Sequence, residues 1–183
     1  MEMIGTKTLE TDRLILRKFT MDDVNDVFKN YGSDPNVTKY LSWKTHESIE
    51  DAKVSVKYFM SSYKDNGYHW AVVLKDINEV IGDIKVHTID KRNNICEIGY
   101  QYGSKFWGNG YATEALKIVI EFLFNECEFH LIEARHRSSN TASGKVMEKA
   151  GMTKDAVLKN RRYNKYTDSY EDLVIYSIIN NKR

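Results

Sequence analysis

Two glycines separated by one residue stand directly before an amphipathic segment, and this junction is well suited to bind an anion. Gly108 and Gly110 let the backbone turn and approach a ligand closely, because neither carries a Cβ atom. The first NH groups of the helix expected from Tyr111 have no partner within that helix, and the positive end of its dipole lies behind them. A diphosphate fits such a place, although a glycine pair before a helix can also be a simple turn.

The residues after the second glycine reduce the number of candidate ligands. A nucleoside-triphosphatase loop requires Gly-Lys-Ser or Gly-Lys-Thr, whereas Gly110 is followed by Tyr111 and Ala112. A dinucleotide fingerprint requires a third small residue where Thr113 stands, and an acidic residue at the end of the next strand. Coenzyme A is the common diphosphate ligand that remains.

Length and composition favour a single globular domain over residues 1–183. The chain is 42% hydrophobic and 29% charged, and no apolar run is long enough to cross a bilayer. The first residues lack the basic start, apolar stretch and cleavage site of a secretory signal, so we expect a cytoplasmic protein. The net charge of +1 gives no footprint for nucleic acid, despite a basic cluster at residues 159–165.

The cysteines and histidines show no pattern of a disulfide framework or a metal site. Cys96 and Cys127 lie in stretches that read as buried, so we expect reduced thiols. The histidines lack metal-ligand spacing to one another or to the cysteines, and we expect no metal. They are His46, His69, His87, His130 and His136.

Hydrophobic periodicity predicts a mixed α/β fold with a mainly antiparallel central sheet flanked by helices. The expected order is strand, two helices, three antiparallel strands, helix, strand, helix and two strands. The strands are expected at about 14–16, 70–74, 80–86, 95–100, 131–135, 156–163 and 173–178. The helices are expected at about 21–31, 49–63, from 111 onward, and at 141–149.

Capping residues support the predicted helix boundaries. Thr20, Ser48 and Asn140 stand where N-caps belong, and Gly151 stands where a left-handed residue ends a helix. Pro35, the one proline of the chain, is expected to break the chain after the first helix.

Seven segments, taken in order and spacing, resemble the GNAT superfamily of acyl-coenzyme-A-dependent N-acetyltransferases. Within it, the chain is similar to the ribosomal-protein alanine N-acetyltransferases, and the resemblance covers nearly the whole chain. The segments are LETDRLILR at 9–17, IGD at 81–83, EIGY at 97–100, WGNGYATEA at 107–115, NTAS at 140–143, EKAGM at 148–152 and DLVIYS at 172–177.

The resemblance implies direct transfer of an acetyl group from acetyl-CoA to an amine within a ternary complex. Trp107 stands where the wider superfamily has Gln or Arg, and the anion site does not depend on that side chain because backbone NH groups are its donors. The cofactor-binding residues it implies are Gln101, Tyr102, Gly103, Trp107, Gly108, Asn109, Gly110, Tyr111, Ala112, Thr113, Asn140 and Ser143.

The resemblance also implies two catalytic residues. Glu97 occupies the position of the base in several members, and the alternative is a surface carboxylate on an alternating strand. Ser143 is the matching candidate for the acid that protonates the departing thiolate, and the alternative is a serine of the helix surface. Many members have a tyrosine that acts as this acid at the position of Met147. This chain has methionine there, so that position supplies no acid.

The pantetheine arm carries two amides and can pair with an exposed strand edge. Gln101, Tyr102 and Gly103 are positioned to offer that edge, and an NH near residue 101 or 102 would polarise the acetyl carbonyl. Gly99 within a strand predicts a bulge that would open a slot against the strand at 131–135.

The acceptor is the part of the reaction that the sequence specifies least. Tyr40, Trp43, Tyr163 and Tyr166 could line an acceptor pocket, or they could be surface aromatics. The family branch favours a protein N-terminus, while a polyamine, an aminoglycoside or an amino acid also supplies an amine. A polyamine acceptor would require an acidic funnel, which the sequence does not show. The alternative from another functional class is a catalytically silent module that binds coenzyme A. The resemblance implies a monomer or a homodimer and leaves the choice between them open.

Overall fold

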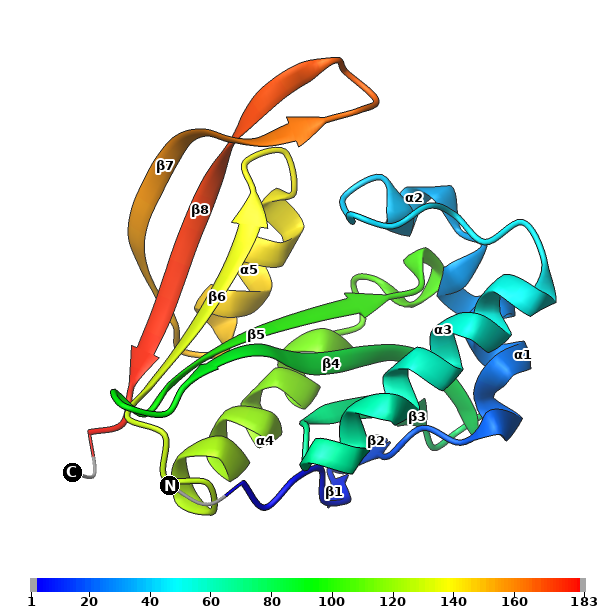
Figure 1. The fold of residues 1–183 in the computed structure, drawn as a ribbon, viewed down its shortest axis with the longest axis horizontal. Coiled ribbons are helices and arrows are strands. Elements are labelled where there is room, and N and C mark those ends of the chain that lie inside the picture. The colour runs from blue at the N-terminus through cyan, green and yellow to red at the C-terminus, as the bar shows by residue number, and fades with distance from the viewer. Residues whose placement is uncertain (1–2, 182–183) are drawn as a thin grey trace.

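The structure, a computed structural model, describes residues 3–181 and contains one eight-stranded sheet (Figure 1). The strand order is β1-β2-β3-β4-β5-β6-β8-β7, and within the described residues only β5 and β6 pair in parallel. The expected mixed, mainly antiparallel sheet is therefore confirmed. The strands are β1 Leu9–Glu10, β2 Leu14–Arg17, β3 His69–Leu74, β4 Glu79–Asp90, β5 Ile95–Tyr102, β6 Leu131–Arg137, β7 Thr153–Asn164 and β8 Ser169–Ile179.

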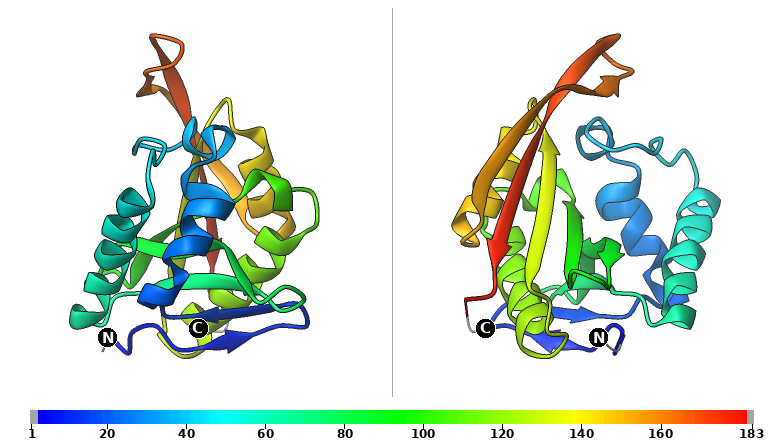
Figure 2. Two further views of the ribbon diagram at one scale, coloured as in Figure 1. Left: turned by 90° about the vertical axis from the view of Figure 1, so that its right-hand side faces the viewer. Right: turned by 60° about the vertical axis from the view of Figure 1, so that its left-hand side comes forward.

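Helices cover both faces of the sheet (Figures 1 and 2). Helices α1 and α3 pack on one face of β2–β4, and α4 packs on the other face of the same strands and β5. Within residues 3–181, no helix has the length and apolar character of a membrane span. The α-helices are α1 Val24–Val27, α2 Pro35–Thr38, α3 Ile49–Ser61, α4 Tyr111–Asn125 and α5 Thr141–Lys149.

The first helical segment is less regular than the predicted helix. A 3-10 turn at Met21–Asp23 leads into α1, and a wide π-turn follows at Phe28–Gly32. The side-chain amide of Asn30, within the wide turn, donates to the carbonyl of Val80 at 2.8 Å. The carbonyl of Asn30 lies so close to Gly103 that a Cβ atom there would be 2.0 Å away. The wide turn thus packs directly against the end of β5.

Pro35 begins a helix rather than breaking the chain, which corrects the sequence-based expectation. Its fixed φ suits the first position of α2, and Asp34 caps that helix by accepting from the NH of Asn36 at 2.9 Å. The other oxygen of the Asp34 carboxylate accepts from the NH of Ser104 at 3.1 Å. Helix α2 is therefore tied to the turn that follows β5.

The other predicted caps are confirmed. Ser48 and Asp51 form a reciprocal capping box at the start of α3, and the Asn140 side chain accepts from the NH of Ser143 at the start of α5. Gly151 ends α5 with φ +94°, a conformation that favours glycine.

Trp70 lies at the centre of the larger core, between the sheet and α4. Its side chain is 0% exposed, and its ring meets Phe122 edge-on with centroids 5.8 Å apart. The indole NH donates to the carbonyl of Lys7 at 2.8 Å, so the buried polar atom is satisfied. This residue joins the amino-terminal segment, β3 and α4.

The slot predicted between two strands is present, but the bulge lies elsewhere. Pairing of β5 with β6 ends at Ile98 and Ala134, beyond which the two strands diverge (Figure 1). Gly99 pairs regularly with Lys85, so the bulge predicted at Gly99 is wrong. The register instead shifts on β4 at His87, which leaves two β4 residues opposite one position of β5.

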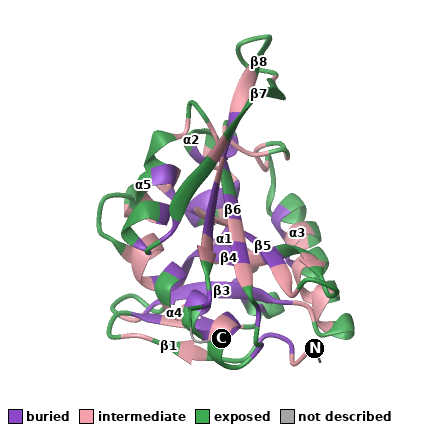
Figure 3. Cartoon of the chain, turned by 90° about the vertical axis from the view of Figure 1, so that its left-hand side faces the viewer, coloured by how far each residue is buried: buried purple, intermediate pink, exposed green. Residues whose placement is uncertain are grey.

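Strands β7 and β8 form a long hairpin that projects beyond the rest of the sheet (Figures 1 and 2). Its distal part is exposed, as the green colouring of Figure 3 shows. The register shifts between Leu158 and Arg162 of β7, which pair with Leu173 and Glu171 of β8. Two extra residues of β7 therefore bend the hairpin at this point.

Candidate active site

Two cavities meet where β5 leaves β6. The loop cavity, of about 690 Å³, lies among the turn after β5 and the amino-terminal ends of α4 and α5. The strand cavity, of about 590 Å³, lies among β4, β5, β6, β7 and the segment after α2. A small molecule extended through the divergence can therefore reach both. The residues that line both cavities are Tyr40, Leu41, Tyr100, Gln101, Asn140 and Ser143.

The glycine turn borders the loop cavity in the expected way. Gly108 and Gly110 have φ values of +81° and +82°, which favour glycine because a Cβ atom is strained there. Both line the cavity together with residues 111–113, the first turn of the fifteen-residue helix α4. The NH groups of that turn lack partners within the helix, so the cavity wall can bind an anion.

Three lysines line the same cavity and were not identified from the sequence. They are Lys117 on α4 and Lys145 and Lys149 on α5. Their positive charge suits a ligand with several phosphates. Little in the sequence points to these lysines as a group, because the faces of α4 and α5 that carry them come together only in the tertiary fold.

Substituting Gly110 with alanine should strain the turn without creating a clash, since the nearest atom to a new Cβ is the Arg13 Nη2 at 3.6 Å. We expect a loss of about 1–2 kcal/mol in the free energy of unfolding and a several-fold weaker affinity for coenzyme A. Chemical denaturation and titration calorimetry measure the two effects. Gly151→Ala is the matched control, since φ at Gly151 is +94° and the residue lines neither cavity. Equal changes of coenzyme A affinity in both variants would contradict the assignment.

Two of the predicted cofactor residues shape the turn instead of lining a cavity. The amide of Asn109 donates to the carbonyls of Phe106 and Trp107 at 3.1 and 3.2 Å. Gly103 donates its NH to Ile81 at 3.0 Å and lies against Asn30. The indole of Trp107, which does line the loop cavity, donates to the carbonyl of Tyr102 at 2.8 Å and so fixes the turn to the end of β5.

Beyond the end of its pairing with β6, β5 has backbone NH groups that point alternately toward β4 and toward the open side. Gly103 bonds to Ile81, and the regular register of β4 and β5 therefore directs the NH of Gln101 toward β4 as well. The NH groups of Tyr100 and Tyr102 consequently point to the opposite side, where pairing with β6 has already ended. Of the two NH groups proposed from the sequence, Tyr102 faces the open side and Gln101 does not.

Side chains of β5 alternate between the two faces of the sheet at the divergence. Tyr100 and Tyr102 belong to the core on the α4 side, whereas Glu97 and Gln101 point to the side of α3. Side chains of β5 can therefore reach a molecule in the slot from both faces of the sheet.

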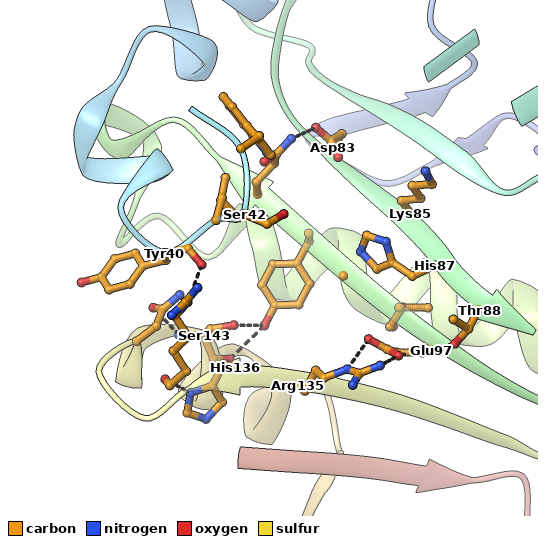
Figure 4. A pocket seen from close by; sticks show the side chains of 18 of the residues that line it. Tyr40, Ser42, Asp83, Lys85, His87, Thr88, Glu97, Arg135, His136 and Ser143 are labelled. Atoms are coloured by element: carbon orange, nitrogen blue, oxygen red, sulfur yellow. Dashed lines mark hydrogen bonds and ion pairs between the residues drawn. The ribbon is translucent and has the colours of Figure 1, made fainter. Parts of the chain in front are cut away.

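Ser143 and Tyr100 form a hydroxyl pair at the junction of the cavities. The Ser143 Oγ donates to the Tyr100 Oη at 3.0 Å, and the Tyr100 Oη donates to the Ser143 carbonyl at 2.9 Å (Figure 4). Burial raises the pKa of Tyr100 well above its ordinary value, so the phenol keeps its proton at neutral pH. The sequence identified Ser143 but not the tyrosine beside it.

Glu97 lines the strand cavity, but its carboxylate is held by an arginine. The Arg135 Nε donates to one carboxylate oxygen at 2.5 Å, and the Arg135 Nη2 contacts the other (Figure 4). The Thr88 hydroxyl lies 3.4 Å from the same second oxygen. Arg135 therefore occupies both of the oxygens that would have to accept a proton from the amine.

His87 was identified from the sequence only as one of several scattered histidines, yet it faces the slot. Its bulged position on β4 places the imidazole over Gly99, where an added Cβ atom would lie 2.4 Å from Nε2. The ring lines the strand cavity (Figure 4). Burial, followed by the nearby charge of Lys85, lowers the pKa of His87 from its ordinary 6.5. A neutral imidazole at pH 7 can accept a proton.

A buried carboxylate lies deeper in the strand cavity. Asp83 accepts from the Gln101 Nε2 at 2.6 Å, and the His69 Nε2 lies 3.2 Å from its other oxygen. Both of its oxygens are therefore engaged by neighbouring side chains.

The four predicted acceptor aromatics do not come together. Tyr40 and Trp43, from the segment after α2, line the strand cavity. Tyr163 and Tyr166 lie on the projecting hairpin, line neither cavity, and are 49% and 56% exposed. The ring of Tyr163 packs on Tyr170 instead, with centroids 5.6 Å apart.

Comparison with known proteins decides the family of the chain. The model of the acetyltransferase (GNAT) domain matches residues 13–153. The chain belongs to the GNAT acetyltransferase family. It is 34% identical over 172 residues to the uncharacterized N-acetyltransferase YoaA of Bacillus subtilis, and the match covers 93% of this chain and 96% of the relative.

Solved structures share the fold of this acetyltransferase. A GNAT acetyltransferase from Bacillus anthracis superimposes with a TM-score of 0.83 at 29% identity, covering 95% of this chain and 99% of that one. A ribosomal L7/L12 alpha-N-protein acetyltransferase in complex with coenzyme A gives a TM-score of 0.83 at 18% identity, covering 94% and 98%. At that identity the second likeness supports the fold alone.

Acetyl-CoA is the cosubstrate of the GNAT fold, to which this acetyltransferase belongs. The loop cavity combines a positive-φ glycine turn, a helix amino terminus and three lysines, as a phosphorylated ligand requires. Among residues 3–181 there is no group of three or more His, Cys, Asp or Glu that could hold a metal ion.

Proposed function

We propose that this acetyltransferase transfers an acetyl group from acetyl-CoA in the loop cavity to a primary amine in the strand cavity. The meeting of the two cavities at the divergence of β5 and β6 is the observation that supports this function best. Both reactants can bind at once, so direct transfer in a ternary complex needs no covalent intermediate on the protein.

The donor would be held by backbone groups at both ends. The NH groups of Tyr111, Ala112 and Thr113 would bind its diphosphate, and Asn140, which lines the same cavity, would lie beside its pantetheine arm. The open edge at Tyr100 and Tyr102 would pair with the amides of that arm. The bound donor supplies the acetyl thioester, and a backbone NH of this edge would polarise its carbonyl.

We propose His87 as the group that takes the proton from the attacking amine. Glu97 remains the candidate that the family resemblance supplies, but Arg135 engages both of its oxygens. None of the ion pairs among the described residues involves the His87 imidazole, and the missing side chain of Gly99 leaves room for the ring in the slot. Geometry and a lowered pKa therefore favour His87 as the base, with Glu97 fixing the position of Arg135.

Ser143 would protonate the departing thiolate and regain its proton from solvent, with Tyr100 orienting the Ser143 hydroxyl through their hydrogen bond. We expect Ser143→Ala to lower kcat about ten- to a hundredfold, with less than about a twofold change in coenzyme A affinity. Tyr100→Phe should lower kcat as well, and the double variant should be no slower than the slower single variant, because the hydroxyls act as one unit. Steady-state kinetics and calorimetry measure these effects. Weaker coenzyme A binding at unchanged kcat would assign Ser143 to binding.

The acceptor favoured by the family branch is a protein N-terminus. Polyamines, aminoglycosides and amino acids are the alternatives, and a silent coenzyme-A-binding module is the competing reading. Release of free thiol from acetyl-CoA with an N-terminal peptide and a panel of free amines tests all of them. We expect release that depends on an amine and is fastest with the peptide. Binding of coenzyme A without thiol release for any amine would support the silent module.

A further inference from the structure

The charged side chains that line the strand cavity are mostly positive. Two carboxylates, Asp83 and Glu97, face four cations. The four, here called the cationic cluster, are Lys85, Arg135, Arg137 and Arg162. An amine acceptor is itself a cation at neutral pH, so these charges are unexpected around it and require an explanation.

Both carboxylates of the cavity are already engaged. Arg135 contacts both oxygens of Glu97, and Gln101 and His69 contact those of Asp83. Neither carboxylate is therefore free to neutralise the remaining cations or to attract a polycation. The cavity thus lacks the acidic funnel that a polyamine acceptor requires.

Three members of the cationic cluster lack a carboxylate within ion-pair distance among residues 3–181. They are Lys85, Arg137 and Arg162, since the nine ion pairs of the described chain involve none of them. Arg137 donates to the carbonyls of Tyr40 and Tyr163 at 3.3 and 3.0 Å, so it joins the two walls of the cavity. Lys85 lies 4.8 Å from the ring centre of Tyr58.

Arg162 is directed to the cavity by the bend in β7. The register of the hairpin shifts between Leu158 and Arg162, and bulges of this kind re-aim side chains beside active sites. Asp172 fixes the bend, because it pairs with Lys159 at 2.7 Å and accepts from the NH of Asn160 at 3.0 Å. The charge of Arg162 lies close enough to lower the pKa of Arg135, after the larger effect of burial.

The cationic cluster is separate from the lysines that suit the donor. Lys117, Lys145 and Lys149 line only the loop cavity, and no member of the cationic cluster lines that cavity. The phosphates of acetyl-CoA therefore do not account for the arginines of the strand cavity.

We propose that the acceptor is an amine that also carries an oxyanion, a carboxylate or a phosphate, which Arg162 and Arg137 bind at the β6–β7 wall of the strand cavity. This inference rests on the proposed function and names its substrate class. Planar guanidinium groups match the geometry of both oxyanions. The same positive charges favour the uncharged form of the amine, which is the form that attacks.

Matched pairs of amines test the proposal by thiol release from acetyl-CoA. The pairs are a peptide with glutamate or glutamine at its second residue, the same peptide with phosphoserine or serine there, and a free amino acid or its amide. Spermidine is the polycationic contrast. We expect the anionic member of at least one pair to have a kcat/KM about tenfold or more above its neutral partner. The pair that shows the preference identifies the source of the oxyanion.

Two charge reversals locate the binding group. Arg162→Glu should abolish the preference for the anionic acceptor, whereas Arg161→Glu should preserve it, because Arg161 is a neighbouring exposed residue that lines neither cavity. Both variants change the net charge equally. The inference would be overturned if the wild type preferred the neutral acceptors or spermidine. It would also be overturned if both variants lost the preference for the anionic acceptor equally. No thiol release with any amine would instead overturn the proposed function itself.

Discussion

Replacing His87 with alanine should lower kcat about a hundredfold or more, because the attacking amine then lacks a proton acceptor in the slot. The imidazole lies over Gly99 at the point where β5 leaves β6 and lines the strand cavity. His87 lies at a bulge and belongs to neither hydrophobic core, so the substitution should leave the fold intact. Steady-state kinetics at saturating acceptor and donor measure the effect.

The pH dependence of kcat distinguishes His87 from Glu97. Burial, Lys85, His69 and Arg135 lower the pKa of His87 below 6.5, and Asp83 opposes them. The protonated imidazole cannot accept a proton, so wild-type kcat should fall as the pH drops through this lowered pKa. His87→Ala should remove that limb of the profile and Glu97→Gln should keep it. Loss of the limb in Glu97→Gln alone would make Glu97 the base.

Replacing Trp70 with alanine should have the largest effect on stability, about 3–5 kcal/mol in the free energy of unfolding. The side chain is fully buried, stacks with Tyr68 at 6.0 Å and meets Phe122 edge-on. For a chain of this length the loss corresponds to a melting temperature lower by about 10 °C. Thermal unfolding followed by circular dichroism measures it.

Two further variants separate cavity formation from general damage. Trp70→Phe keeps an aromatic ring but loses the hydrogen bond to Lys7, so it should cost less than the alanine variant. Ile77→Ala, at a residue that is 47% exposed, should change stability by less than about 0.5 kcal/mol. A Trp70→Ala variant as stable as Ile77→Ala would contradict the packing described for the larger core.

Features that depend on neighbouring residues could be predicted from the sequence. The capping box at Ser48, the N-cap at Asn140 and the positive φ values of Gly108 and Gly110 all follow from residues within one helical turn. The glycine turn before α4 could be predicted for the same reason. Pro35 was misread because proline both ends helices and begins them, and the cap at Asp34 decided the outcome.

Features that depend on strand register could not be predicted. Glu97 and Arg135 meet because β5 and β6 pair in parallel with Glu97 opposite Glu133, a register that no local pattern specifies. The bulge at His87 likewise exists only relative to the partner strand β5. Gly99 of that strand, where the sequence predicts the bulge, lies against the His87 ring. The acceptor side of the site is made almost entirely of such long-range contacts.

Transfer of an isotopically labelled acetyl group from acetyl-CoA to an amine, followed by mass spectrometry of the acceptor, tests the central claim most directly. The wild type should place the label on the amine nitrogen of the acceptor, at a rate that His87→Ala reduces about a hundredfold or more. Label that stays on coenzyme A with every amine, while the protein still binds coenzyme A, would contradict the account.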